Sequence, residues 1–301
     1  MTRLAVPAAA AALALAGAVV GQAQQSPVFR AKSELVVLHV LVKDHQGAYA
    51  GGLPADAFHV YEEKQEQPVR FFIGADAPVT VGLLIDSSGS MRAVRDRVIA
   101  ASSAFVDSSH PEDEIFALTF DDDVRAVLPE ATPFTRDAGV LRRALTDVFL
   151  PAGRTALYDA LDRGLRSVIQ GTRERQVLVV VSDGGDNASH AGFTGTLISA
   201  QASNTAIYTV ALVDPTGEES NPGRLAKFAS TSGGAAFAPN DIAGVERALA
   251  QISSEIRHSY TIGYEPPASH RLPGFHRLRV EVRSPDGRKL VTRTREGYHA
   301  P

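Results

Sequence analysis

The central part of the chain alternates short apolar runs with helical patterns, and this alternation restricts the fold more than any other feature. The runs Val81–Ile85, Ile115–Phe120 and Val177–Val181 are almost wholly apolar, as strands buried on both faces should be. Between residues 157 and 168, leucine or valine recurs every three or four positions, which is typical of a helix with one buried face. Strands that alternate with helices predict a doubly wound α/β fold, with a parallel-rich sheet covered on both sides.

Both ends of the chain carry a β pattern instead. Apolar residues dominate Val36–Val42, and Leu278, Val280 and Val282 alternate with charged residues. Neither end holds enough strands for a good core of its own. We therefore expect residues 28–76 and 257–301 to pair in a small β-sandwich into which the α/β domain, residues 79–256, is inserted. Two separate β appendages are the alternative.

The N-terminus has the features of an export signal. Arg3 precedes an Ala/Leu/Val stretch, and Gly21-Gln22-Ala23 is a small-x-small cleavage sequence. We expect residues 1–23 to be a signal peptide that leaves no stable membrane span after cleavage. A retained anchor is the alternative, although the apolar run is short for a full span. The absence of cysteine excludes disulfides and a lipid-modified cysteine, and it favours a bacterial periplasmic, envelope-associated or secreted protein.

Charge and motif content exclude several classes of function. The chain has 30 basic and 34 acidic residues. It therefore lacks the excess of basic residues that would favour binding to nucleic acid or to an anionic membrane. The chain lacks a Gly-x-Ser-x-Gly elbow, a Gly-x-Gly-x-x-Gly fingerprint and a Walker-type lysine loop. A serine nucleophile needs a base within hydrogen-bond reach, and no histidine is placed for that role. We therefore expect a protein that is not an enzyme.

Oxygen-bearing side chains follow two of the expected strands and precede one expected helix. Asp86, Ser88 and Ser90 come directly after Val81–Ile85, Asp183 comes after Val177–Val181, and Thr155 precedes the helix that starts near Ala156. In an open α/β sheet, ligands bind at the carboxyl ends of the strands. Carboxylates and hydroxyls suit Mg²⁺, or Mn²⁺ or Ca²⁺, rather than zinc or copper. The histidines show no ligand spacing that would indicate a zinc site.

This pattern resembles the von Willebrand factor type A domain and its metal-ion-dependent adhesion site, which has Asp-x-Ser-x-Ser, then a Thr, then an Asp on later loops. The resemblance covers about residues 79–256 and implies a Rossmann-like fold. It implies that the metal ligands are Asp86, Ser88, Ser90, Thr155 and Asp183. The flanking segments resemble a bacterial subfamily of exported proteins whose function is unsettled.

The resemblance also implies how such a site works. The carboxylates of the family often act through water, and one coordination position stays open for a carboxylate of another protein. We therefore expect an exported binding or adhesion module that uses its cation to bind an acidic side chain of a protein partner. One alternative is a scaffold subunit of an envelope assembly, in which the metal braces the loops. A metal-assisted hydrolase is the other.

Several nearby features have simpler interpretations. Asp121-Asp122-Asp123 is typical of a solvated turn between two strands rather than of a second cation site. Asp159 is expected to bind loop backbone, and Asp186 could help the metal through water. A helix is expected to begin near Met91, and its positive N-terminal dipole would face the same anionic ligand.

Overall fold

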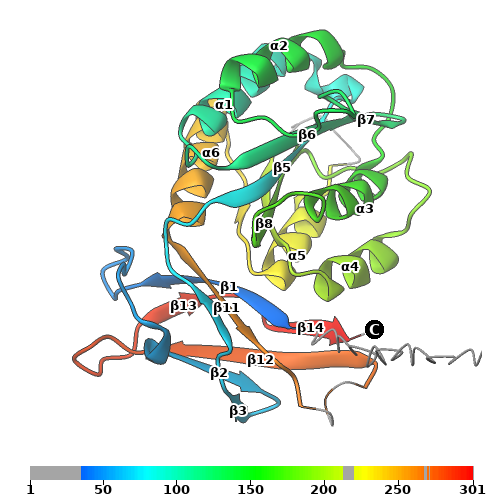
Figure 1. Ribbon diagram of the computed structural model, residues 1–301. Helices are drawn as coiled ribbons and strands as arrows, with labels where there is room; N and C mark the ends of the chain where they lie inside the picture. The colour runs from blue at the N-terminus through cyan, green and yellow to red at the C-terminus, as the bar shows by residue number, and fades with distance from the viewer. Residues whose placement is uncertain (1–34, 213–219, 268–269, 271, 301) are drawn as a thin grey trace, which may run out of the picture. The chain divides into compact units, whose positions relative to one another are not determined.

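The computed structural model describes residues 35–212, 220–267, 270 and 272–300. Its central sheet has six strands in the order β10-β9-β8-β5-β6-β7 (Figure 1). Their bounds are β5 (Val79–Asp86), β6 (Glu114–Phe120), β7 (Val124–Ala126), β8 (Arg175–Ser182), β9 (Ala206–Ala211) and β10 (Ala236–Phe237). All neighbours run parallel except β7, which pairs antiparallel with β6 at the edge. The parallel-rich sheet predicted from the apolar runs is therefore confirmed.

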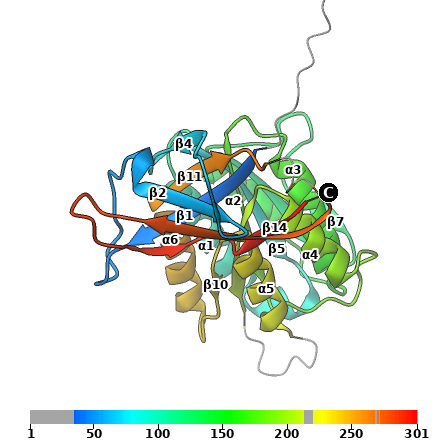
Figure 2. The same ribbon diagram turned by 90° about the horizontal axis from the view of Figure 1, so that it is seen from below.

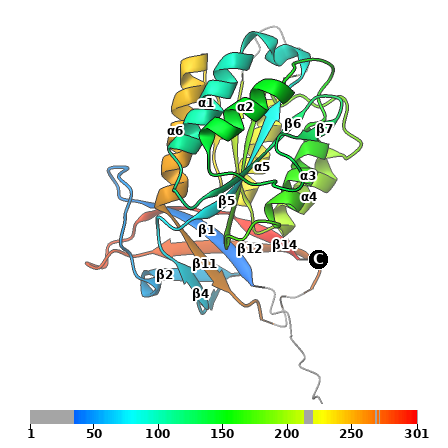
Figure 3. The same cartoon turned by 45° about the horizontal axis from the view of Figure 1, so that its top comes forward.

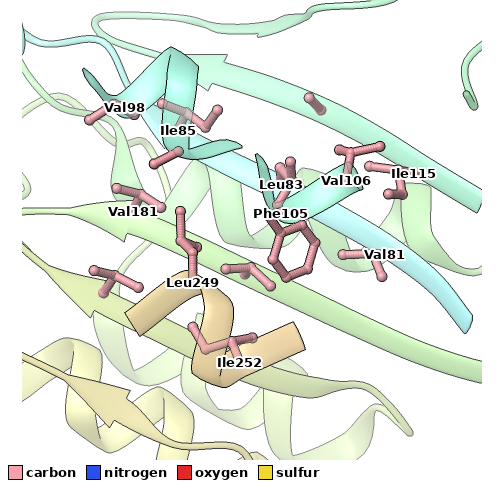
Figure 4. Packing of buried hydrophobic residues seen from close by; sticks show 14 of the residues in the cluster. Val81, Leu83, Ile85, Val98, Phe105, Val106, Ile115, Val181, Leu249 and Ile252 are labelled. Carbon is pink, nitrogen blue, oxygen red and sulfur yellow. The ribbon is translucent and has the colours of Figure 1, made fainter. Parts of the chain in front are cut away.

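Helices cover both faces of this sheet (Figures 1 and 3). On one face lie α1 (Arg95–Asp107), α2 (Ala138–Val148) and α6 (Ile242–His258), and on the other lie α3 (Leu157–Val168), α4 (Phe193–Ala202) and α5 (Pro222–Ser232). Figure 4 shows Phe105 of α1 and Leu249 of α6 packed near Leu83 of β5. Successive residues of each buried strand thus face two separate apolar cores, which explains the continuous apolar runs.

The first helix begins later than the sequence suggests. The helix expected near Met91 starts at Arg95, and residues Gly89–Ala93 form a 3-10 helix before it. Ser88 could have capped this segment, but its side chain makes no capping hydrogen bond and its hydroxyl faces Ser90 instead. The expectation of a full helix dipole at this point was therefore wrong. The short 3-10 turn Gly89–Ala93 stands at this point in place of the expected α-helix.

Strands from the two ends of the chain pair in two four-stranded sheets, ordered β13-β1-β11-β4 and β14-β12-β2-β3 (Figure 2). We call the described residues of these segments, 35–76 and 259–300, the terminal β region. Its strands are β1 (Val36–Lys43), β2 (Phe58–Glu62), β3 (Gln65–Gln67), β4 (Phe71–Ile73), β11 (Ser259–Tyr264), β12 (Gly274–Val282), β13 (Val291–Arg293) and β14 (Gly297–Ala300). Both sheets contribute side chains to one apolar cluster.

A 3-10 turn, η1 (Ala55–Ala57), leads into β2. The expected signal peptide, residues 1–23, lies outside the described residues. Within the part of the chain that the structure describes, no helix is long and apolar enough to cross a membrane.

Candidate metal site

The candidate site lies where β5 and β8 end. These strands are parallel neighbours, with Ile85 opposite Val181, so Asp86 and Ser182 end the two strands side by side. The loops that follow carry Ser88 and Ser90 on one side and Asp183 on the other. The sheet thus brings together residues almost one hundred positions apart in the sequence, as the strand-end argument predicts.

Asp86 is the buried base of the site. Its side chain is fully enclosed, and its Oδ1 accepts a hydrogen bond from the Ser88 backbone N–H at 2.9 Å. Its Oδ2 accepts one from the Ser182 hydroxyl at 2.6 Å. Burial raises the pKa of Asp86 to about 6, although these hydrogen bonds oppose the rise, and the charge of Asp183 adds to it. A cation nearby would offset the charge of a carboxylate held this way.

Ser88, Ser90 and Asp183 form the outer part of the site. The hydroxyl oxygens of Ser88 and Ser90 are 3.1 Å apart, and the Ser90 hydroxyl donates to Asp183 Oδ2 at 3.0 Å. Asp183 Oδ1 accepts a hydrogen bond from the Gly185 backbone N–H at 2.9 Å. Ser88 is buried, Asp183 is half-buried and Ser90 is exposed. One side of this group of oxygens is therefore open to solvent.

Thr155 joins the site through main-chain contacts between loops. Its backbone N–H donates to Asn187 Oδ1 at 2.8 Å, and its carbonyl accepts from the Asn187 N–H at 3.0 Å. The preceding residues are held against the first loop, because Ala152 N–H donates to the Ser87 carbonyl and Gly89 N–H donates to the Gly153 carbonyl. The structure thus assembles the three predicted loops. Direct hydrogen bonds join Ser88 to Ser90, Ser90 to Asp183, and the Asp86 side chain to the Ser88 main chain.

The donor set fits a small, hard cation. Adjacent ligands of an octahedral Mg²⁺ ion, at about 2.0–2.1 Å from the metal, lie about 2.9 Å from each other, whereas those of Ca²⁺ lie roughly 3.3–3.7 Å apart. The two oxygen–oxygen distances here are 3.1 and 3.0 Å. Among the described residues no group of three or more His, Asp or Glu side chains could hold a metal ion. A metal at this site would therefore depend on the serine and threonine hydroxyls.

The affinity for Mg²⁺ is expected to fall as the pH falls below about 6. Because burial raises the pKa of Asp86 to about 6, the carboxyl becomes protonated there and no longer favours a cation. Calorimetric titration at pH 7.5, 6.5, 5.5 and 4.5 measures this, with up to about a tenfold weaker apparent affinity for each unit below 6. Equal affinities at pH 7.5 and 4.5 would contradict the role of Asp86.

The acidic residues around the site have structural partners. Asp121 pairs with Arg125 at 2.5 Å in the turn between β6 and β7, and Asp122 pairs with Arg154 at 2.9 Å, so the predicted turn is confirmed. Asp159 accepts from the His190 and Ala191 backbone N–H groups at 2.9 and 2.8 Å, as expected.

Asp186 accepts from the Ser189 hydroxyl at 2.5 Å and from the Tyr158 N–H at 3.3 Å. Asp186 therefore stabilises the loop that contains Ser189.

Two supporting residues were missed from the sequence. Ser182 holds Asp86, and Asn187 holds Thr155. Ser182 ends a predicted strand directly before Asp183, and this position could have indicated a role at the site. Asn187 lies in a loop, and no sequence pattern indicated its role. Gly153 has φ +69°, and a Cβ there would lie 2.1 Å from Asp122 Oδ2. Glycine is therefore required for the turn that presents Arg154 and Thr155.

The comparison with protein families agrees with this geometry. Residues 81–185 match the model of the von Willebrand factor type A domain. The chain contains a von Willebrand factor type A domain. The matched stretch holds all five predicted ligands, from Asp86 to Asp183. No curated protein sequence matches the chain.

Solved structures with a von Willebrand factor type A fold are similar at low identity. The von Willebrand factor type A protein from Catenulispora acidiphila is 13% identical, with 89% of this chain and 75% of that chain covered and a TM-score of 0.55. The vWF domain of the type V pili tip protein Mfa5 from Porphyromonas gingivalis is 14% identical, with 61% and 96% covered and a TM-score of 0.50.

Proximal thread matrix protein 1 from the mussel byssus, solved with a zinc-occupied MIDAS motif, is 15% identical. The alignment covers 65% of this chain and 49% of that one, with a TM-score of 0.52. Identities this low support a shared fold and leave the function of this chain to its own residues.

Proposed function

We propose that this chain is a non-enzymatic, exported binding module. It uses a divalent cation, Mg²⁺ (or Mn²⁺ or Ca²⁺), to bind an acidic side chain of a partner protein. The cation would be held by Asp86, Ser88, Ser90, Thr155 and Asp183. The observation that carries the proposal is the cluster of Ser88, Ser90 and Asp183 oxygens, spaced 3.0–3.1 Å apart over the buried Asp86. A bound cation supplies an electrophilic centre for an anionic ligand.

The coordination of the site leaves a position for an anionic partner. Both oxygens of Asp86 already accept hydrogen bonds from the protein, which places this carboxylate behind the hydroxyls. Asp183 is then the anionic side chain nearest the open side. The five residues can supply five oxygen ligands, and a carboxylate from another protein can supply the sixth that Mg²⁺ prefers.

The rim of the site is also suited to an acidic protein surface. Arg154 is held by Asp122 with its side chain 65% exposed, and Arg92 reaches the Pro151 carbonyl from the opposite loop at 3.3 Å. Leu150, on the same loop as Arg154, is 66% exposed. Arginine and exposed apolar side chains are enriched in protein interfaces. Such a rim fits a partner that offers a carboxylate beside an apolar contact.

We also propose that residues 28–76 and 257–301 form a single domain that carries the inserted von Willebrand factor type A domain outside the cytoplasm. The pairing of β1 with β11 and of β2 with β12 supports this arrangement, because each pair joins the two ends of the chain. The lack of cysteine is compatible with export, since an oxidising compartment then creates no mispaired disulfides.

Capture of a partner tests the proposed function. Wild-type protein, Ser90→Ala and the exposed, distant control Ser230→Ala are immobilised, exposed to envelope extract in Mg²⁺, and eluted with EDTA. We expect the same proteins to elute from the wild-type and Ser230→Ala columns and to be absent from the Ser90→Ala column. Retention that survives EDTA, or that is equal on Ser90→Ala, would contradict the proposal and favour a scaffold whose metal only braces the loops.

A further inference from the structure

A pocket of about 460 Å³ lies at the edge of the central sheet, between α3 and the strands β6 and β7 (Figure 1). Its outer wall is the segment of residues 128–134, which we call the edge loop. Both ends of this loop are fixed to β6. The Val127 N–H donates to the Ala117 carbonyl at 2.9 Å, and Ile115 and Thr135 exchange two hydrogen bonds. The pocket is therefore formed by the fold itself, as small-molecule sites usually are.

The interior of the pocket is apolar. Phe116 and Leu118 of β6 and Leu128 of the edge loop line it, and all three are buried. Phe134 of the edge loop is half-buried, and its ring meets that of Phe116 edge-on, with centroids 5.8 Å apart and planes at 86°. Part of this aromatic surface faces the pocket, so an apolar or aromatic group of a ligand would find matching surface there.

Two arginines of α3 form the polar wall. Arg163 is half-buried, and its Nη1 donates to the Val124 carbonyl at 2.5 Å, which fixes the guanidinium beside β7. Arg166 lies three positions later on the same side of the helix, and it makes no hydrogen bond or ion pair with any described residue. Burial raises the pKa of the neighbouring Asp162, and the charge of Arg166 opposes that rise only in part.

The opposite side of the pocket carries one acidic residue, Glu130 of the edge loop. Its side chain is exposed and forms no ion pair with Arg163 or Arg166. The lining thus holds two guanidinium groups and one carboxylate, which leaves an excess of positive charge on the α3 side. This balance favours a ligand with a single negative charge, because a second anionic group would approach Glu130.

We propose that this pocket binds a small organic acid with one carboxylate and an apolar body. The carboxylate would lie on Arg166 and Arg163, since a guanidinium group can bind both oxygens of a carboxylate. The apolar body would pack between Phe116, Phe134 and the buried leucines. The volume of the pocket lies in the range of small-molecule sites, roughly 300–1,000 Å³. This site needs no cation, and it does not depend on the proposed function.

Ligands of one shape and different charge test the proposal. Full-length protein is titrated with phenylbutanoate, neutral phenylbutanol and phenylbutylammonium by ligand-observed NMR, with EDTA present so that no cation at the Asp86 site can attract the carboxylate. We expect wild type to bind the acid about tenfold more tightly than the alcohol, and the ammonium ion most weakly. Arg166→Gln should remove the advantage of the acid and leave binding of the alcohol unchanged.

Two further variants show where the ligand lies. Phe134→Ala should weaken the acid and the alcohol by a similar factor, about fivefold or more, because both lose the same apolar contact. Arg142→Gln, at an exposed arginine of α2 on the other face of the sheet, is the matched control and should bind all three ligands as wild type does. Lack of saturable binding of the acid by wild type would overturn the proposal. Equal binding of the acid by wild type and Arg166→Gln would also overturn it.

Discussion

Replacing Asp86 with asparagine is expected to stabilise the metal-free protein at pH 7 and to abolish its stabilisation by Mg²⁺. The carboxylate is buried against Ser182 and Ser88, and burial raises its pKa to about 6. A neutral amide of the same shape avoids the cost of burying the charge. It cannot supply the charge that holds a cation, so the same substitution acts in opposite directions with and without metal.

The direction of this stability change follows from the linkage between protonation and folding. The pKa of Asp86 is higher in the folded protein, at about 6, than in the unfolded chain, at about 3.9, so its contribution to stability is complete below pH 4 and is lost as the pH rises through 6. At pH 7 the ionised carboxylate then costs about 3 kcal/mol. Asparagine should recover about 1–3 kcal/mol of this, because its NH₂ group fits the Ser182 hydroxyl less well.

Chemical denaturation measures the free energies of unfolding of wild type and Asp86→Asn. Each protein is measured at pH 7 and at pH 4.5, with EDTA and with Mg²⁺. Wild type should gain about 2.7 kcal/mol at a hundredfold excess of Mg²⁺ over Kd, and Asp86→Asn should gain nothing. At pH 4.5 the two proteins should converge. Asp107→Asn, at an exposed carboxylate, serves as the control. A destabilised metal-free Asp86→Asn at pH 7 would show that the carboxylate is structural.

The α/β core was predictable because each of its strands carries its own signal. Val81–Ile85 and Val177–Val181 are apolar at every position, since both faces are covered by helices. Short polar strands carry no such signal: β3 (Gln65–Gln67) is recognisable only through its pairing with β2, and β14 pairs with β12 at the sheet edge. The start of α1 was also misplaced, because Ser88 faces Ser90 instead of capping a helix.

The candidate metal site was predictable for a similar reason. Its residues follow strand ends in a fixed pattern, so the sequence alone indicated that Asp86 and Asp183 lie close together. The role of Asn187 was missed, because only the folded loop brings its side chain to the Thr155 backbone.

Arg175 connects the two chain segments that cross between the terminal β region and the von Willebrand factor type A domain. It begins β8 and is 1% exposed. Its Nη1 donates to the Ala77 carbonyl at 3.0 Å, just before β5, and its Nη2 donates to the Ile256 carbonyl at 2.5 Å, near the end of α6. Burial lowers the pKa of Arg175 to about 10, so the side chain stays charged at neutral pH.

Arg175→Met is expected to destabilise the protein by about 2–4 kcal/mol. The methionine fills much of the volume and removes a costly buried charge, but the carbonyls of Ala77 and Ile256 lose their donor. Leaving two acceptors unpaired should outweigh that relief, at about 1–3 kcal/mol for each. Arg175→Lys, which can reach one carbonyl at a time, should fall between wild type and Arg175→Met.

The neighbouring pair Arg257–Asp76 provides the matched control, because it links the same two crossing segments at 2.7 Å but is 35% and 61% exposed. Arg257→Ala should cost less than about 1 kcal/mol, as exposed ion pairs do. Urea denaturation gives the free energies, and limited proteolysis should cut Arg175→Met within residues 75–79 or 256–259 well before wild type. If Arg175→Met and Arg257→Ala lost the same small amount of stability, the buried guanidinium would not be what holds the segments at Ala77 and Ile256 together. The packing of α6 would hold them instead.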